Sequence, residues 1–208
     1  MYQLYYQPFA CSFAVHAALE KIGQPFDLHK INLANGDQKT EAFLAMNPQG
    51  QVPVLKHGDT TMTQAAAILL QLSELHPEAD LMPEANSEGR SAALQSLFFL
   101  SNSVHPVFSR MFHPYRISKE SPNDVKAMAG EKIRSFLAEY NRLFETQDFC
   151  ISHQAYAPDY YLFTMLNWLP MFNMDLGDYP NVKGFLSNMK ELPEVERTLQ
   201  TETLSMAA

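Results

Sequence analysis

Hydrophobic and polar residues follow two different periods at the start of the chain. Strict alternation predicts a strand at residues 2–7, and apolar residues on one side of residues 12–22 predict a helix. Gly23 stands where a helix C-cap glycine is expected. Residues 26–31 alternate again, and because a helix separates the two strands, we expect them to be parallel.

Two more helices and a hairpin complete this first region. A short helix is predicted at Thr40–Met46, a hairpin turn at Gly58-Asp59, a strand at 60–62 and a strongly apolar helix at 64–75. With the strand-like run that ends at Leu55, the order is β-α-β-α-β-β-α. This order predicts a small mixed sheet with helices on its faces.

The second half of the chain shows only helical periodicity. Residues 159–169 are apolar on nearly all sides, so we expect this helix to be the buried centre of its domain, with Asp159 suiting the helix dipole in the first turn. A bend is expected at Pro106. The other helices predicted here are 88–112, an amphipathic helix whose apolar stripe runs from Ile133 to Phe144, 182–192 and 194–204.

These patterns predict two domains. The fold class is α/β plus all-α: an N-terminal sheet domain at residues 1–77 is followed by an all-helical domain at residues 88–208. Residues 78–87 are polar and have no period, so we interpret them as a linker.

Composition narrows the class of protein. The 208 residues are 46% hydrophobic and 18% charged, which is typical of a packed globule. The net charge of −8, with no basic cluster, argues against nucleic-acid binding. No apolar run approaches the roughly 20 residues of a membrane span. Residues 1–4 lack a signal-peptide profile, so a cytoplasmic location is expected, and two cysteines imply no disulfide framework.

A thiol and a hydroxyl, Cys11 and Ser12, stand where the first strand turns into the first helix. A helix N-terminus presents unpaired N–H groups and a partial positive charge, which favour a thiolate and lower its pKa. This position therefore predicts a reactive Cys11. The alternative is that Cys11 is a small buried hydrophobic residue, as most free cysteines are.

A proline interrupts the next strand-like run, Gln49-Gly50-Gln51-Val52-Pro53-Val54-Leu55. Proline cannot donate to a sheet ladder. A cis Val52–Pro53 bond would turn the chain here and direct the main-chain N–H and C=O of Val52 outward.

In this order and spacing the motifs resemble the glutathione transferase superfamily. The resemblance rests on Tyr5-Tyr6-x-Pro-x-Ala-Cys-Ser, Asn47-Pro-x-Gly-Gln-Val-Pro-Val-Leu, Val104-His105 and Asp159-x-Tyr-Leu-Phe. It spans nearly the whole chain and looks like the bacterial beta class, in which a cysteine leads the active site. It implies a thioredoxin-like glutathione-binding domain followed by the helical domain.

The resemblance implies an enzyme that uses glutathione as co-substrate. It would conjugate glutathione to hydrophobic electrophiles in detoxification, or exchange thiols and disulfides through Cys11. Cys11 would lie beside the glutathione sulfur, Ser12 would hydrogen-bond it, and Val52 would hold the tripeptide backbone. The residues expected in catalysis are Cys11, Ser12, Tyr6 and His105, and those expected to bind glutathione are Gln51, Val52, Pro53, Gln64 and Ala65.

Some positions depart from the family pattern. Gln64-Ala65 replaces an acidic residue followed by Ser, Thr or Gly, the loop at 35–37 lacks a frequent lysine, and Pro106 replaces another. Each change weakens the binding of an anionic ligand. They favour an alternative function, a non-catalytic scaffold that keeps the fold. A third interpretation keeps catalysis but changes the reaction, to an isomerase or a reductive dehalogenase.

The resemblance also implies a homodimer and a pocket for an electrophile. Candidates for this pocket are Phe108, Met111, Phe112, Tyr115 and Trp168, and apolar candidates for the dimer surface are Met62, Leu69, Leu70 and Phe99. An aromatic residue at helical spacing is more often part of the core. Cys150-x-x-His153 supplies only half of a zinc site, so no metal is expected.

Overall fold

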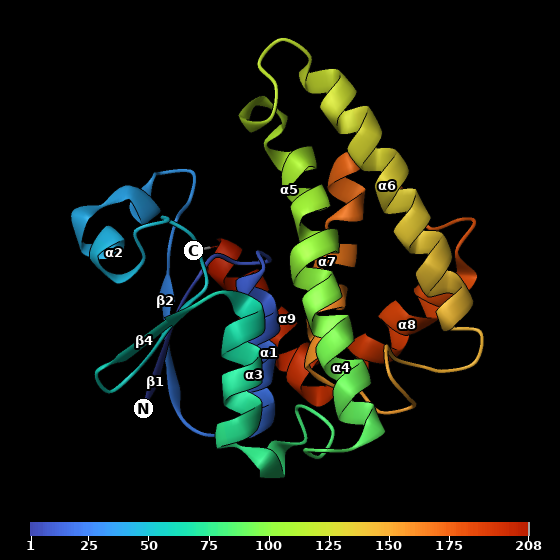
Figure 1. The fold of residues 1–208 in the computed structure, drawn as a ribbon. Coiled ribbons are helices and arrows are strands. Elements are labelled where there is room, and N and C mark those ends of the chain that lie inside the picture. Colours follow the sequence, from blue (N-terminus) through green and yellow to red (C-terminus); the bar gives the residue numbers. More distant parts are fainter. Residues whose placement is uncertain (208) are drawn as a thin grey trace. The chain divides into compact units, whose positions relative to one another are not determined.

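The protein, described here from a computed structural model that covers residues 1–207, contains two compact units (Figure 1). One unit joins residues 1–84 to the segment from Lys190 onward, and the other comprises Ala85–Met189. The C-terminal segment thus belongs with the sheet, whereas the sequence placed it in the helical domain. Its helix packs along the first helix and is joined to it by a buried bond between Glu202 and His16.

A four-stranded mixed sheet in the order β2-β1-β3-β4 forms the centre of the first unit. The pair β1–β2 is parallel, as predicted, and the pairs β1–β3 and β3–β4 are antiparallel. The strands are β1 (Tyr2–Tyr6), β2 (Phe26–Lys30), β3 (Val54–His57) and β4 (Thr60–Thr63), and the helices are α1 (Ser12–Ile22), η1 (Asp37–Lys39), α2 (Glu41–Met46), α3 (Ala65–Leu75), η2 (Pro77–Ala79) and α9 (Pro193–Ala207).

The alternation within β1 explains how the two faces of the sheet are covered. Tyr2, Leu4 and Tyr6 are buried while the residues between them are partly exposed. Figure 1 shows α1 and α3 side by side on one face, where they also contact each other, and α2 on the other. Tyr5 faces this second side and packs against a small cluster that includes Phe43 of α2.

The second unit is helical throughout its regular structure, and the described residues contain no helix long and apolar enough to cross a membrane. Its elements are α4 (Glu88–Phe99), the π-helical turn η3 (Leu100–Val104), α5 (His105–Phe112), η4 (Pro114–Arg116), α6 (Pro122–Leu143), α7 (Ala157–Leu166), η5 (Leu169–Phe172) and α8 (Pro180–Lys190). All ten residues of α7 are buried, which confirms its central position.

Several predicted helix bounds shift by a few residues, and two expectations change more. The predicted helix 88–112 is interrupted by η3 just before Pro106, which has no N–H for the preceding turn. The segment interpreted as a linker also takes part in packing, because Leu81 and Met82 are buried. Burial of these apolar side chains is more favourable in free energy than leaving them in water, as a solvated linker would.

Asp159 fixes the start of α7. Its carboxylate is fully buried and accepts hydrogen bonds from the main-chain N–H groups of Tyr156, at 2.8 Å, and Cys150, at 2.7 Å. The first bond caps the helix, and the second ties the preceding loop to it.

We expect Asp159→Ala to lower the free energy of unfolding by about 2–4 kcal/mol, because two buried donors lose a charged acceptor. Asp159→Asn, which keeps one acceptor oxygen, should lose less. Urea unfolding followed by circular dichroism measures both. An alanine variant as stable as the wild type would contradict this role for the carboxylate.

Candidate active site

The segments with candidate chemistry in the first unit meet at one edge of the sheet. Tyr5 pairs with Val54, and Val54 pairs with Thr63. Three segments therefore leave the sheet at the same end of its strands. They are the loop that follows β1, the residues that precede β3 and the residues that follow β4. These segments contain Cys11, Val52-Pro53 and Gln64-Ala65, respectively.

Cys11 immediately precedes α1, as predicted. It is partly exposed, and its Sγ lies 3.2 Å from the main-chain oxygen of Val52, to which the thiol donates. The structure thus joins two positions separated by 41 residues, the thiol and the residue before the interrupting proline. The bond requires the protonated form of the sulfur.

The pKa of Cys11 changes in the direction opposite to the one predicted. Burial, the largest effect, raises the pKa of the thiol to about 12, although the main-chain N–H groups of Cys11 and Ser12 act to lower it. The N–H groups at the helix N-terminus thus lower the pKa, as expected, but desolvation of the thiolate raises it by more. At neutral pH the Cys11 side chain is a thiol.

Val52 contributes main-chain groups to this edge. The Val52–Pro53 bond is cis, as the sequence analysis predicted. Both side chains are buried, and among the described residues the Val52 N–H has no hydrogen-bond partner. The neighbouring Gln51 is exposed, and its carbonyl accepts a bond from the Asn47 side chain at 2.7 Å.

Gln64 and Ala65 stand at the start of α3. Gln64 has a left-handed backbone with φ of 70°, and its exposed side-chain amide donates to Gln49 at 3.3 Å. Ala65 is buried and offers only main-chain groups. A ligand here meets a helix N-terminus and one amide side chain.

The hydroxyl groups of Ser12 and Tyr6 both make hydrogen bonds within the protein. The Ser12 side chain is fully buried, and its hydroxyl donates to the Gln7 carbonyl at 3.1 Å, so its single proton is used within the loop. Tyr6 is buried and its hydroxyl donates to Ser205 of α9 at 2.8 Å. Both side chains hold the site's framework together.

His105 lies in the second unit at the start of α5. Its Nδ1 is 2.7 Å from the Tyr161 hydroxyl, and its ring lies 5.4 Å from that of Trp168. Burial lowers the pKa of His105 to about 4, so the ring is neutral near pH 7. A neutral imidazole here can accept or donate one hydrogen bond.

The residues proposed for a substrate pocket and for a dimer surface differ in exposure. Phe108, Met111 and Trp168 are buried and Phe112 is half-buried, whereas Tyr115 is 66% exposed. Leu69 is fully buried, so including it in an exposed dimer surface was wrong, because its side chain already packs in the core. The remaining candidates for that surface, Met62, Leu70 and Phe99, are half-buried.

Cys150 and His153 lie in different environments. Cys150 is buried, and burial is the main cause that raises its pKa well above the usual range. His153 instead contacts Asp148 at 2.7 Å, and no group of three potential ligands occurs among the described residues.

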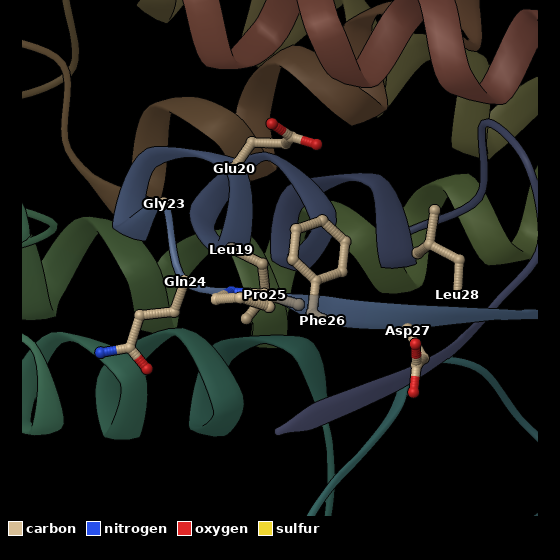
Figure 2. Close-up of a pocket in the computed structure, with 8 residues that line it drawn as sticks. All are labelled: Leu19, Glu20, Gly23, Gln24, Pro25, Phe26, Asp27 and Leu28. Carbon is tan, nitrogen blue, oxygen red and sulfur yellow. The ribbon is translucent and has the colours of Figure 1, made fainter.

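An open groove of about 520 Å³ lies at the far end of α1 from Cys11. Figure 2 shows its lining residues coming from the C-terminal end of α1, from the connection that follows it and from β2. The groove contains no thiol, so it is separate from the candidate site.

A buried polar pair joins α1 to α9, and the sequence patterns did not indicate it. His16 of α1 and Glu202 of α9 are both fully buried, and His16 Nδ1 lies 2.9 Å from Glu202 Oε1. The signal was the helical spacing of Val195, Thr198 and Glu202, all fully buried, which places a carboxylate on an inward-facing stripe.

Comparison with known proteins gives consistent results over the whole chain. The model of the glutathione S-transferase N-terminal domain matches residues 10–75, and that of the C-terminal domain matches residues 103–193. The curated glutathione S-transferase GstA of Escherichia coli O157:H7 is 30% identical, over 97% of this chain and 99% of that protein.

Two solved structures show the same similarity. A sphingomonad glutathione S-transferase complexed with glutathione is 32% identical, with a TM-score of 0.87 over 97% of this chain and 99% of that one. A bacterial beta class glutathione S-transferase of Sphingomonas chungbukensis is 30% identical, with a TM-score of 0.85 over the same shares.

The raised pKa of Cys11 predicts how the thiol reacts. Its alkylation by iodoacetamide should be slow at neutral pH and should accelerate about tenfold per pH unit up to about pH 10. Mass spectrometry of the peptide that contains Cys11 follows the rate, and the peptide with buried Cys150 is an internal control. A rate that levels off below about pH 8 would contradict a raised pKa.

The lowered pKa of His105 predicts a loss of stability in acid. An unfolded histidine titrates near 6.5 and folded His105 near 4, so protons bind the unfolded chain first as the pH falls. The stabilisation is present above pH 6.5 and declines towards pH 4, by on the order of 3 kcal/mol. Urea unfolding of wild type and His105→Asn tests this, and a difference independent of pH would contradict it.

Proposed function

Because this chain belongs to the glutathione S-transferase family, we propose that it is a glutathione transferase that binds its co-substrate at the sheet edge around Cys11 and Val52. One observation carries this proposal: the Cys11 sulfur lies 3.2 Å from the Val52 carbonyl, beside a main-chain N–H with no partner among the described residues. A thiol and a main-chain clamp are thereby adjacent. Glutathione offers a thiol attached to a peptide backbone.

The clamp would recognise the backbone of the tripeptide. The Val52 N–H and C=O would pair with the cysteinyl residue of glutathione, as an added strand pairs with a sheet edge. Gln51 and Pro53 would shape the two sides of this contact. The γ-glutamyl carboxylate would approach the start of α3, where Gln64 offers an amide and Ala65 a main-chain N–H.

The protonation state of Cys11 favours conjugation as the reaction. With a pKa of about 12, Cys11 would remain a thiol at neutral pH and would donate a hydrogen bond to the glutathione sulfur in place of the Val52 carbonyl. A donor at this point stabilises the glutathione thiolate, which then attacks the electrophile. Cys11 therefore supports the nucleophile without being the nucleophile.

Thiol–disulfide exchange through Cys11 is the second candidate. It is favoured by the partial exposure of Cys11 next to the clamp, which would hold a glutathione disulfide within reach. Exchange needs the thiolate, which a pKa of about 12 makes scarce at neutral pH. It is the slower reaction in this proposal.

A non-catalytic scaffold is the third candidate. It is favoured by Gln64 and Ala65, because neither supplies a charge for the γ-glutamyl end. Losing a charge-assisted bond there lowers affinity by about ten- to a hundredfold. A scaffold would turn over no glutathione substrate, whereas the first two candidates would.

The remaining features of the proposal follow the family. The protein would be a beta-like homodimer of the cytoplasm that detoxifies hydrophobic electrophiles. Aromatic residues of the second unit, among them Phe112 and Tyr115, would line the electrophile pocket, and His105 would contribute a neutral hydrogen-bonding group.

Substitution of Cys11 separates these candidates. In the proposed conjugation, Cys11→Ala removes a donor to a thiolate and should lower kcat/KM by about 10- to 100-fold at pH 7. Cys11→Ser keeps a donor and should retain most of the activity. Conjugation of glutathione to 1-chloro-2,4-dinitrobenzene and reduction of a mixed disulfide measure the two reactions.

Each candidate has its own outcome. Serine as damaging as alanine in conjugation would contradict the role of donor, and loss of disulfide reduction alone would favour exchange. Absence of both activities in the wild type, with no retention on immobilised glutathione at low salt, would leave the scaffold.

A further inference from the structure

The loop that carries Cys11 contains a strained residue. Phe9 has φ of 58°, in the left-handed region, where a bulky side chain is rarely found. This conformation is disfavoured by about five- to thirtyfold for a residue with a Cβ. Because Phe9 precedes Cys11 by only two residues, a return of its backbone to negative φ would move the thiol.

A carboxylate from the other end of the sequence holds this residue. The Phe9 main-chain N–H donates to Glu202 Oε2 at 2.5 Å, across 193 residues of sequence. The other oxygen of Glu202 lies 2.9 Å from His16 Nδ1. A carboxylate only accepts hydrogen bonds, so His16 carries its proton on Nδ1 and donates.

The position of Glu202 is itself secured. Glu202 and His16 are fully buried, in the interface between α9 and α1. Near the C-terminal end of α9, Ser205 accepts a bond from the Tyr6 hydroxyl at 2.8 Å, and its carbonyl accepts one from the Lys30 ammonium. These contacts fix α9 against the end of β1, where the Cys11 loop begins.

From these contacts we infer that Glu202 is a positioning residue for Cys11, holding the loop in its left-handed conformation through the Phe9 N–H. This deepens the proposed function and rests on it only for the kinetic part of the test. The carboxylate does not touch the reacting sulfur and acts through the backbone. Through Glu202, α9 thus helps to position the thiol.

The inference predicts a separation of kcat from KM. Glu202→Ala should raise the exchange rate of the Phe9 amide with solvent about tenfold or more and lower kcat about tenfold, with little change in KM for glutathione. KM is spared because no hydrogen bond joins Val52 to α9 among the described residues. Glu196→Ala is the matched control, since Glu196 is exposed on the same helix and, among the described residues, its side chain hydrogen-bonds only with Gln200.

A second substitution distinguishes positioning from general packing. Glycine adopts positive φ without steric cost, so in a Phe9→Gly background the loss of kcat caused by Glu202→Ala should shrink to about twofold. If Glu202 only stabilised the packing of α9, the loss would be the same in both backgrounds. Equal losses would overturn the inference.

The amide measurement is independent of catalysis. If the wild type shows no glutathione turnover, the proposed function fails, while hydrogen exchange at Phe9 still decides on Glu202. Should Glu202→Ala not fold, Glu202→Gln replaces it, because a neutral oxygen should protect the Phe9 amide less than the carboxylate does. Protection at Phe9 equal to that of the wild type would overturn the inference in either variant.

Discussion

The proposed function depends above all on the contact between the Cys11 sulfur and the Val52 carbonyl. It brings a thiol at the start of α1 to the main chain that precedes β3, and neither segment alone forms a site. The sheet makes the contact possible, because the register of β1, β3 and β4 directs three loops to one edge. The family's N-terminal domain model covers both segments, which fits a site assembled by the fold.

Two opposing effects act on the thiol, and their relative size decides its chemistry. Main-chain N–H groups at the start of α1 stabilise a thiolate, whereas burial removes water from it, and burial has the larger effect. A protonated Cys11 is a hydrogen-bond donor, and a donor suits a bound sulfur anion. Burial also decides the charge of His105 in the second unit, because it lowers the pKa of the ring and keeps it neutral.

Local sequence signals predicted the elements well. The helix at 12–22 and its C-cap at Gly23 were both as expected, since apolar spacing and a left-handed glycine act within a few residues. The hairpin at Gly58-Asp59 and the cis Val52–Pro53 bond follow from equally local chemistry. Asp159 was expected to suit the dipole of this helix from its place in the first turn, and there it caps α7.

Long-range partners were beyond such reasoning. No local pattern indicates that the Ser12 hydroxyl turns inward to Gln7, because its alternative partner would be a ligand. Nor does any local pattern indicate that Glu202 binds Phe9. The pattern shows only that Glu202 is a charged residue on an otherwise inward-facing stripe of α9. Desolvation of Cys11 depends on the packing of the whole unit and therefore needs coordinates.

The most direct test of the account is the response of the Val52 amide to glutathione. In an ¹⁵N-labelled protein titrated with reduced glutathione, the Val52 N–H signal should shift downfield and saturate as the N–H gains a hydrogen-bond acceptor. A Val52 signal that stays in place while glutathione binds elsewhere, or while it fails to bind at all, would contradict the account.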